Sequence, residues 1–131
     1  MSYSQANLYR EREVLTASPE KLVVITFDHV LVNLRRARVA IEAGNIERRV
    51  QALTKAREGV MELLTSVDIE RGGPVAQNLL ALYSFAVREM FEVGRTKDVA
   101  KLDGIVTVIG NLREAFATIA VEPKVAAVPA A

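Results

Sequence analysis

Residues 18–45, SPEKLVVITFDHVLVNLRRARVAIEAGN, decide the fold because they contain the start, one apolar face and the end of a long helix. The Ser18 hydroxyl can cap the helix, and Pro19 suits the first turn, where its missing N–H would have no partner. The apolar face recurs at alternating steps of four and three residues: Val23, Phe27, Val30, Leu34, Ala37 and Ile41. Gly44 ends the helix because glycine enters the left-handed C-cap conformation without penalty.

Similar start and stop residues predict three more helices. Asn45 caps the second helix, Pro74 opens the third after the break at Gly72-Gly73, Gly94 ends the third, and Asp98 caps the fourth. The apolar face of the second helix consists of Ile46, Val50, Leu53, Val60, Leu64 and Val67. The heptad seam of the fourth consists of Leu102, Ile105, Ile109, Leu112, Phe116 and Ile119.

These elements predict an all-α fold, an antiparallel up-down four-helix bundle over residues 18–120. Helices of about 20–25 residues would be roughly 30–37 Å long, and short connections favour antiparallel neighbours. Residues 1–17 carry Leu8, Tyr9, Val14 and Leu15, which are too apolar for a fully solvated arm. We expect this segment to dock on the bundle as a lid, and residues 121–131 to form a mobile tail.

Composition excludes several classes of function. The 131 residues suit one domain, and half of them are hydrophobic, enough for a core without disulfides or metal. The absence of cysteine excludes thiol catalysis and thiolate metal sites, and it suits the cytoplasm. A net charge of +1 gives no general attraction to nucleic acid. We expect a soluble cytoplasmic protein, without a secretory signal and without insertion into a membrane.

No constellation of residues predicts an enzyme, a cofactor or a metal ion. His29 is the single histidine, and Val32 and Asn33 stand where a second metal ligand would be needed on the helix. A histidine phosphotransfer domain using His29 is an alternative, although no cation lies in the next turn. The arginines around residues 35–49 are interleaved with acids, which is typical of a solvated helix end.

The first helix has more apolar surface than a bundle needs. Ile25, Val32 and Val39 lie seven residues apart, on the side away from the Phe27 and Leu34 face. Two interpretations are compatible: residues 1–17 cover this stripe, or a partner helix binds it.

The third and fourth helices have milder anomalies. Phe85 lies outside the apolar arc of the third helix, beside Asn78. The outer side of the fourth helix consists of small or neutral residues: Ala100, Gly104, Thr107, Gly110, Asn111 and Thr118. Each glycine costs about 1 kcal/mol of helix stability relative to alanine, a cost that is useful where another backbone must come close. Strong packing of the seam is the alternative reason for tolerating them.

Three stretches resemble the flagellin-specific export chaperone family, FliS. They are VLTASPEKL at 14–22, AIEAGN at 40–45 and GGPVAQNLLALY at 72–83, and the likeness covers roughly residues 3–119. A weaker match, LREAF, follows at 112–116, where the family tends to have tryptophan at the last position. The chain departs from the family at 26–29, where leucine-tyrosine-aspartate-glycine is usual, and at Ser84-Phe85, where aspartate-tyrosine is usual.

The resemblance implies a chaperone without catalysis. It implies binding of the disordered C-terminal segment of flagellin, prevention of premature filament assembly, and delivery to a membrane component of the flagellar type III export gate. It also implies that the tyrosine-bearing N-terminal segment moves as cargo binds, with Tyr3 and Tyr9 at the matching positions.

Residues and resemblance together give a set of candidate partner-binding residues: Tyr3, Leu8, Tyr9, Ile25, Val32, Val39, Asn78, Leu82, Phe85, Gly104, Thr107 and Asn111. The alternative from a different class is a structural bundle that self-associates through the same stripes.

Overall fold

The computed structural model describes residues 2–121, with residues 2–4, 13–16 and 121 described by their backbone alone. This part of the chain contains no strand, so the predicted all-α class is confirmed. Its helices are α1 (Ser2–Thr16), α2 (Pro19–Glu42), α3 (Ile46–Thr65), α4 (Ile69–Thr96) and α5 (Val99–Val121). The predicted tail lies outside the described residues, except for the last residue of α5.

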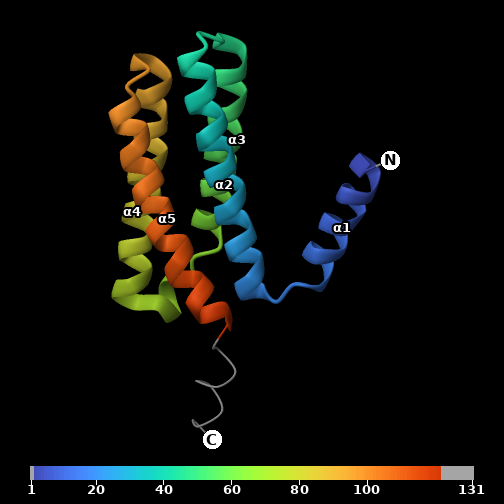
Figure 1. Cartoon of the computed structure of the whole chain (residues 1–131). Coiled ribbons are helices and arrows are strands. Elements are labelled where there is room, and N and C mark those ends of the chain that lie inside the picture. Colours follow the sequence, from blue (N-terminus) through green and yellow to red (C-terminus); the bar gives the residue numbers. More distant parts are fainter. Residues whose placement is uncertain (1, 122–131) are drawn as a thin grey trace, which may run out of the picture.

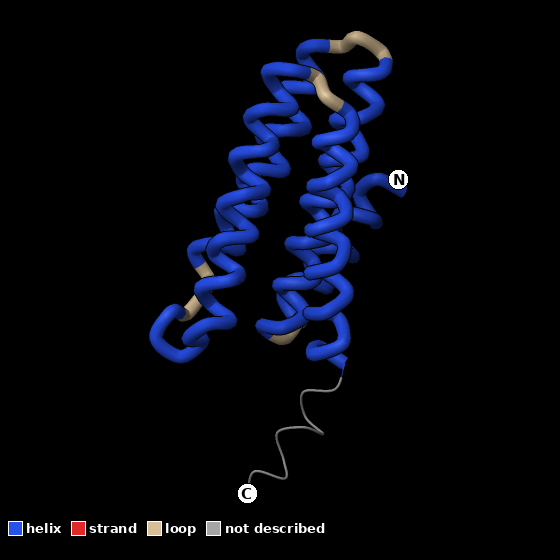
Figure 2. The backbone as a smooth tube through the Cα atoms, turned by 90° about the vertical axis from the view of Figure 1, so that its left-hand side faces the viewer, coloured by secondary structure: helices blue, strands red, loops and turns tan. Residues whose placement is uncertain are grey.

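Helices α2 to α5 run alternately up and down and form a four-helix bundle (Figure 1). Both α2 and α4 pack against α3 and α5, and the connecting loops lie at the two ends of the bundle (Figure 2). The predicted up-down bundle is therefore confirmed. All four helices contribute buried core residues: Phe27, Val30, Leu31, Leu34, Ala37, Ala52, Leu53, Ala56, Val60, Leu63, Tyr83, Ala86, Met90, Val93, Leu102, Ile105 and Ile109.

The predicted caps of α2 and α3 form as hydrogen-bonded motifs. Ser18 accepts a hydrogen bond from the backbone N–H of Lys21 at 3.2 Å, with Pro19 in the first turn. At the other end Gly44 has φ +67° and donates to Ile41, while Asn45 donates to Ala40 at 2.8 Å. This pair of bonds is a Schellman motif, in which glycine takes the left-handed conformation. Asn45 then accepts from Arg48 N–H at 3.0 Å and starts α3.

The predicted limits of the third helix were wrong in two respects. Asp68 caps an extra turn before Gly73, which has φ 53° and ψ −131° and kinks α4 ahead of Pro74. Gly94 does not end the helix, because α4 continues to Thr96 and the left-handed residue is Lys97, at φ 60°. A Cβ on Gly94 would lie 3.6 Å from Leu53, an ordinary van der Waals contact, so the packing of α3 against α4 does not itself require glycine here.

The predicted apolar face of α3 was wrong at its N-terminal end, where Ile46 and Val50 are exposed. Small residues face α2 instead, and a Cβ on Gly59 would lie 2.6 Å from Cγ2 of Val30. Because α2 and α3 approach this closely, α3 is turned so that Ala52 and Ala56 are buried. The heptad seam of α5 is confirmed at its start, whereas Ile119 at its end is exposed.

Residues 1–17 were expected to dock on the bundle. Within this segment Ser2–Thr16 form the helix α1, which lies apart from the bundle in Figure 1. Leu8 and Tyr9 are exposed, Tyr9 by 69% of its surface. Docking therefore stays a prediction, and it would require α1 to move relative to α2.

The close approach of α2 and α3 predicts that Gly59→Ala lowers the melting temperature. Val30 is fully buried and β-branched, so it has little freedom to move away from the added methyl. We expect a loss of roughly 1–3 kcal/mol, as for other overpacked cores.

Gly104→Ala is the matched control, since a Cβ at that position has no heavy atom within 4 Å. Alanine there should raise stability by about 1 kcal/mol. Thermal melts followed by circular dichroism compare the two variants. A Gly59→Ala protein as stable as the parent would contradict the packing described for α2 and α3.

Candidate partner-binding surfaces

The predicted second stripe of α2 is largely exposed. Val39 exposes 65% of its surface, Val32 exposes 38%, and Ile25 is half-buried. Unlike Phe27 and Leu34, which are fully buried, these side chains are not needed for the core. An apolar stripe that the described part of the chain leaves exposed is typical of an interaction surface.

Two ion pairs hold α2 beside α5. Arg38 pairs with Asp103 near one end, and Nε of Arg113 lies 2.8 Å from Asp28 near the other. Hydrogen bonds from Arg113 to the carboxylates of Asp28 and Glu114 raise the pKa of its guanidinium. Such partly exposed pairs contribute only about 0–1 kcal/mol each. Each pair joins one position of α2 to one position of α5, so together they align the two helices along their length.

The outer side of α5 is open, as predicted. Gly104, Thr107 and Asn111 are exposed, and a Cβ on Gly104 or Gly110 would meet no heavy atom within 4 Å. Neither glycine is therefore needed for packing inside the bundle. A helix from another chain could approach the α5 backbone closely on this side.

The predicted residues of α4 border α5 on its other side. Leu82 and Asn78 are exposed, and Phe85 exposes 39% of its surface. Lys101 of α5 lies 3.7 Å from Glu89 of α4, which links these two helices. The structure thus brings three groups of predicted residues onto three contiguous helices, α2, α5 and α4. We call this surface the α5-centred face; its residues are Ile25, Val32, Val39, Asn78, Leu82, Phe85, Gly104, Thr107, Gly110 and Asn111.

The predicted residues of the N-terminal segment are not part of this face. Leu8 and Tyr9 lie on α1, and the side chain of Tyr3 is outside the described residues. The structure places α1 apart from the helices that carry the other candidates (Figure 1).

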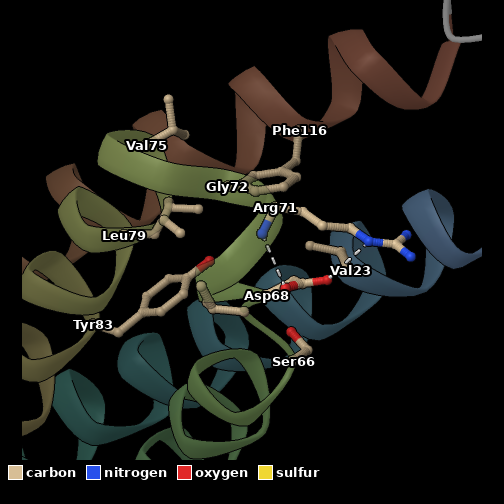
Figure 3. A pocket seen from close by; sticks show the side chains of 11 residues that line it. Val23, Ser66, Asp68, Arg71, Gly72, Val75, Leu79, Tyr83 and Phe116 are labelled. Atoms are coloured by element: carbon tan, nitrogen blue, oxygen red, sulfur yellow. Dashed lines mark hydrogen bonds and ion pairs between the residues drawn. The ribbon is translucent and has the colours of Figure 1, made fainter.

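A cavity of about 350 Å³ lies near the α3–α4 connection, and the sequence did not predict it. Figure 3 shows Tyr83, Leu79 and Phe116 pointing toward it, and the kinked first turn of α4 borders it at Gly72. Burial raises the pKa of the Tyr83 hydroxyl to about 12, so it stays protonated. The ring of Phe116 packs 5.4 Å from that of Phe27. The double glycine before Pro74 could have indicated this cavity, since two residues without side chains leave space at this point.

A second missed feature is a groove between α3 and α4, with a volume of about 340 Å³. We call it the α3–α4 groove; it is lined by Arg49, Val50, Leu53, Thr54, Arg57, Phe91, Gly94 and Arg95. It was missed because Val50 was assigned to the core.

The polar groups give no catalytic arrangement within residues 2–121. No three histidine, cysteine or acidic side chains in that range are grouped to hold a metal ion. Asn33 is buried, and its amide donates to the backbone oxygen of His29 at 2.9 Å, so it belongs to the helix structure. His29 itself is exposed. In the same range, no helix has both the length and the apolar character that crossing a membrane requires.

The structure therefore defines a class: an all-α four-helix bundle with exposed apolar side chains on several of its helices. Comparison with known proteins identifies a family within this class. The family model described as flagellar protein FliS matches residues 1–123.

Curated relatives agree with this match. The flagellar secretion chaperone FliS of Salmonella typhimurium is 30% identical over 116 residues, covering 88% of this chain and 84% of the relative. The protein of the same name from Escherichia coli K12 is 31% identical with the same coverage. That from Bacillus subtilis is 25% identical over 108 residues, or 82% of this chain and 80% of the relative.

This chain belongs to the FliS family. The predicted family is confirmed, and membership supports a role as a chaperone in building the flagellum. The family is one of chaperones, so the prediction that the chain is not an enzyme is also confirmed. Neither the phosphotransfer alternative for His29 nor a purely structural bundle gains support from these relatives.

Proposed function

We propose that this chain is a cytoplasmic export chaperone that binds the disordered C-terminal segment of flagellin. It prevents premature polymerisation of flagellin and delivers it to the flagellar type III export apparatus, through a membrane protein of the export gate. The observation that carries the proposal is the α5-centred face, where exposed apolar residues of α2 and α4 flank the open backbone of α5.

The face suits a ligand that folds as it binds. Ordering a disordered segment costs free energy, which burial of apolar side chains along a groove can offset. Val32, Val39 and Phe85 offer such surface on a scaffold whose core is complete without them. Glycines on α5 let a bound helix come close enough for extensive van der Waals contact.

Self-association is the competing proposal, because two copies could cover the same apolar residues. Light scattering of the free chain and of the chain with flagellin distinguishes the two. A cargo-binding face predicts a monomer that forms a complex with flagellin, whereas a dimer interface predicts a dimer that flagellin does not dissociate.

Val32→Asp should weaken flagellin binding and leave helicity nearly intact. Val32 is exposed on α2, so the new carboxylate stays hydrated in the free protein but would be buried against an apolar cargo side chain. We expect at least about a tenfold rise in Kd by calorimetry, since burying an unpaired charge costs more than 1.4 kcal/mol.

The matched control is Ile46→Asp, which places the same charge at an exposed apolar residue of α3 outside both the α5-centred face and the α3–α4 groove. It should leave flagellin affinity unchanged. If Val32→Asp melts the bundle, or if both variants bind flagellin as the parent does, the proposed cargo surface is wrong.

The double variant Gly104→Ala and Gly110→Ala should move stability and binding in opposite directions. Both sites have open space for a methyl group, so each alanine should add about 1 kcal/mol to the stability of the free protein. The same methyls would keep a cargo helix from approaching α5, so flagellin affinity should fall. A double variant that is more stable and binds flagellin as tightly would show that cargo is held elsewhere.

Flagellin binding should change amide hydrogen exchange in α1. Leu8 and Tyr9 are exposed in the free chain, so apolar surface is available for docking on the bundle or on the cargo. Exchange measured by mass spectrometry over residues 1–17, with and without flagellin, tests this. Equally fast exchange in both states would contradict the proposal that the N-terminal segment acts as a lid, without affecting the α5-centred face.

A further inference from the structure

The α3–α4 groove shares no residue with the α5-centred face and has its own exposed apolar residues. Val50 exposes 53% of its surface and Phe91 exposes 58%, and Leu53 is buried beneath them. Gly94 lines the groove between these side chains, so the α4 backbone is accessible there. The core does not contain Val50 or Phe91, so both side chains are free to contact a partner.

The charged residues that line this groove are all arginines. Arg49, Arg57 and Arg95 line it, and no carboxylate does. Arg95 is already paired with Glu92, at 2.8 Å. Arg57 lies over the ring of Phe91, 4.3 Å from its centroid, and donates to the hydroxyl of Thr54 at 3.2 Å. Its charge is thus held beside the apolar surface without a carboxylate partner among the described residues.

Arg49 provides a second, independent observation. Its Nε is buried and has no hydrogen-bond partner among the described residues. A buried N–H of a charged group without an acceptor is costly, by about 1–3 kcal/mol or more. A carboxylate bound in the groove would supply the missing acceptor after a rotation of the Arg49 side chain that uncovers Nε, and guanidinium groups bind carboxylates through two parallel hydrogen bonds.

We infer that the α3–α4 groove is a docking site for an acidic amphipathic helix of a partner protein. The apolar side of that helix would cover Val50 and Phe91, and its carboxylates would pair with Arg49 and Arg57. This inference does not rest on the proposed cargo function, because it involves other residues, although α4 contributes to both surfaces.

A second copy of this chain fits the groove poorly. A symmetric dimer through this surface would be formed by the same patch on both copies, so it would bring two sets of three arginines together. Repulsion between like charges in a partly desolvated interface opposes that arrangement. Charge complementarity therefore favours an acidic helix over self-association.

Synthetic peptides and the full chain test the inference. The probe is an amphipathic peptide of about 18 residues, roughly 27 Å of helix, with leucine on one side and glutamate flanking it. The reference peptide has the same leucines with lysine in place of glutamate. In fluorescence anisotropy at low salt, the acidic peptide should bind at least about tenfold tighter, and added salt should reduce its affinity.

Variants locate the binding site. Arg57→Glu and Phe91→Ser should each lower the affinity for the acidic peptide by about tenfold or more, as for residues central to an interface. The controls are Arg48→Glu, on the side of α3 that faces α2, and Ile69→Ser, an exposed residue in the first turn of α4. Both controls should stay within about twofold of the parent, because distant surface changes have small effects. Circular dichroism and melting temperature check that each variant is folded.

Several outcomes would overturn the inference. They are equal binding of the acidic and basic peptides, no binding of either, and equal losses for Arg48→Glu and Arg57→Glu, which would indicate general charge attraction. Light scattering gives a further contradicting outcome. If the parent chain forms a dimer and Phe91→Ser abolishes it, the groove binds a second copy of this chain.

Discussion

The close contact between α2 and α3 is the constraint on which the rest of the structure depends. A methyl group on Gly59 would lie 2.6 Å from Val30, so the two helices can pack this closely only with glycine at this position. Small residues of α3 therefore face α2, and Ala52 and Ala56 are buried. The larger apolar residues Ile46, Val50 and Met61 consequently face outward on α3. One packing contact thus accounts both for the bundle and for the apolar part of the α3–α4 groove.

The sequence predicted the ends of those helices whose capping residues lie next to one another in the chain. Each helix cap acts through hydrogen bonds to residues a few positions away, so all residues of the cap can be read from a short stretch of sequence. The examples are Ser18 with Pro19, Gly44 with Asn45, and Asp98. Gly94 was misread because it keeps a helical backbone conformation, and the left-handed residue that ends α4 is Lys97. A glycine inside a helix and a glycine that ends a helix look alike in one sequence.

The candidate surface was predictable for a related reason. Val32 and Val39 form a stripe that a single buried face cannot use, and an excess of this kind is visible in the periodicity of α2. The α3–α4 groove was not predictable, because alanine and glycine count weakly as core residues in a hydrophobic pattern. The pattern alone therefore assigned Val50 to the core in place of Ala52. Burial of small residues is decided by the distance between helices, which only the folded chain reveals.

Exposed apolar surface is a liability for an ordinary bundle, since it invites aggregation. It is tolerable here because the fully buried core, with Phe27 packed between Tyr83 and Phe116, is separate from the exposed faces. Binding can then cover Val32, Val39 or Phe85 without rearranging that core. The residues that stabilise the core and the residues proposed to bind cargo are consequently different residues of the same helices.

The central claim, that the chain holds the C-terminal segment of flagellin, is tested most directly by comparing the affinities of intact flagellin and of flagellin lacking that segment. Calorimetry with the full chain should give tight binding of intact flagellin, equally tight binding of the isolated segment, and no binding of the truncated protein. Truncated flagellin that binds as tightly as intact flagellin would contradict the account.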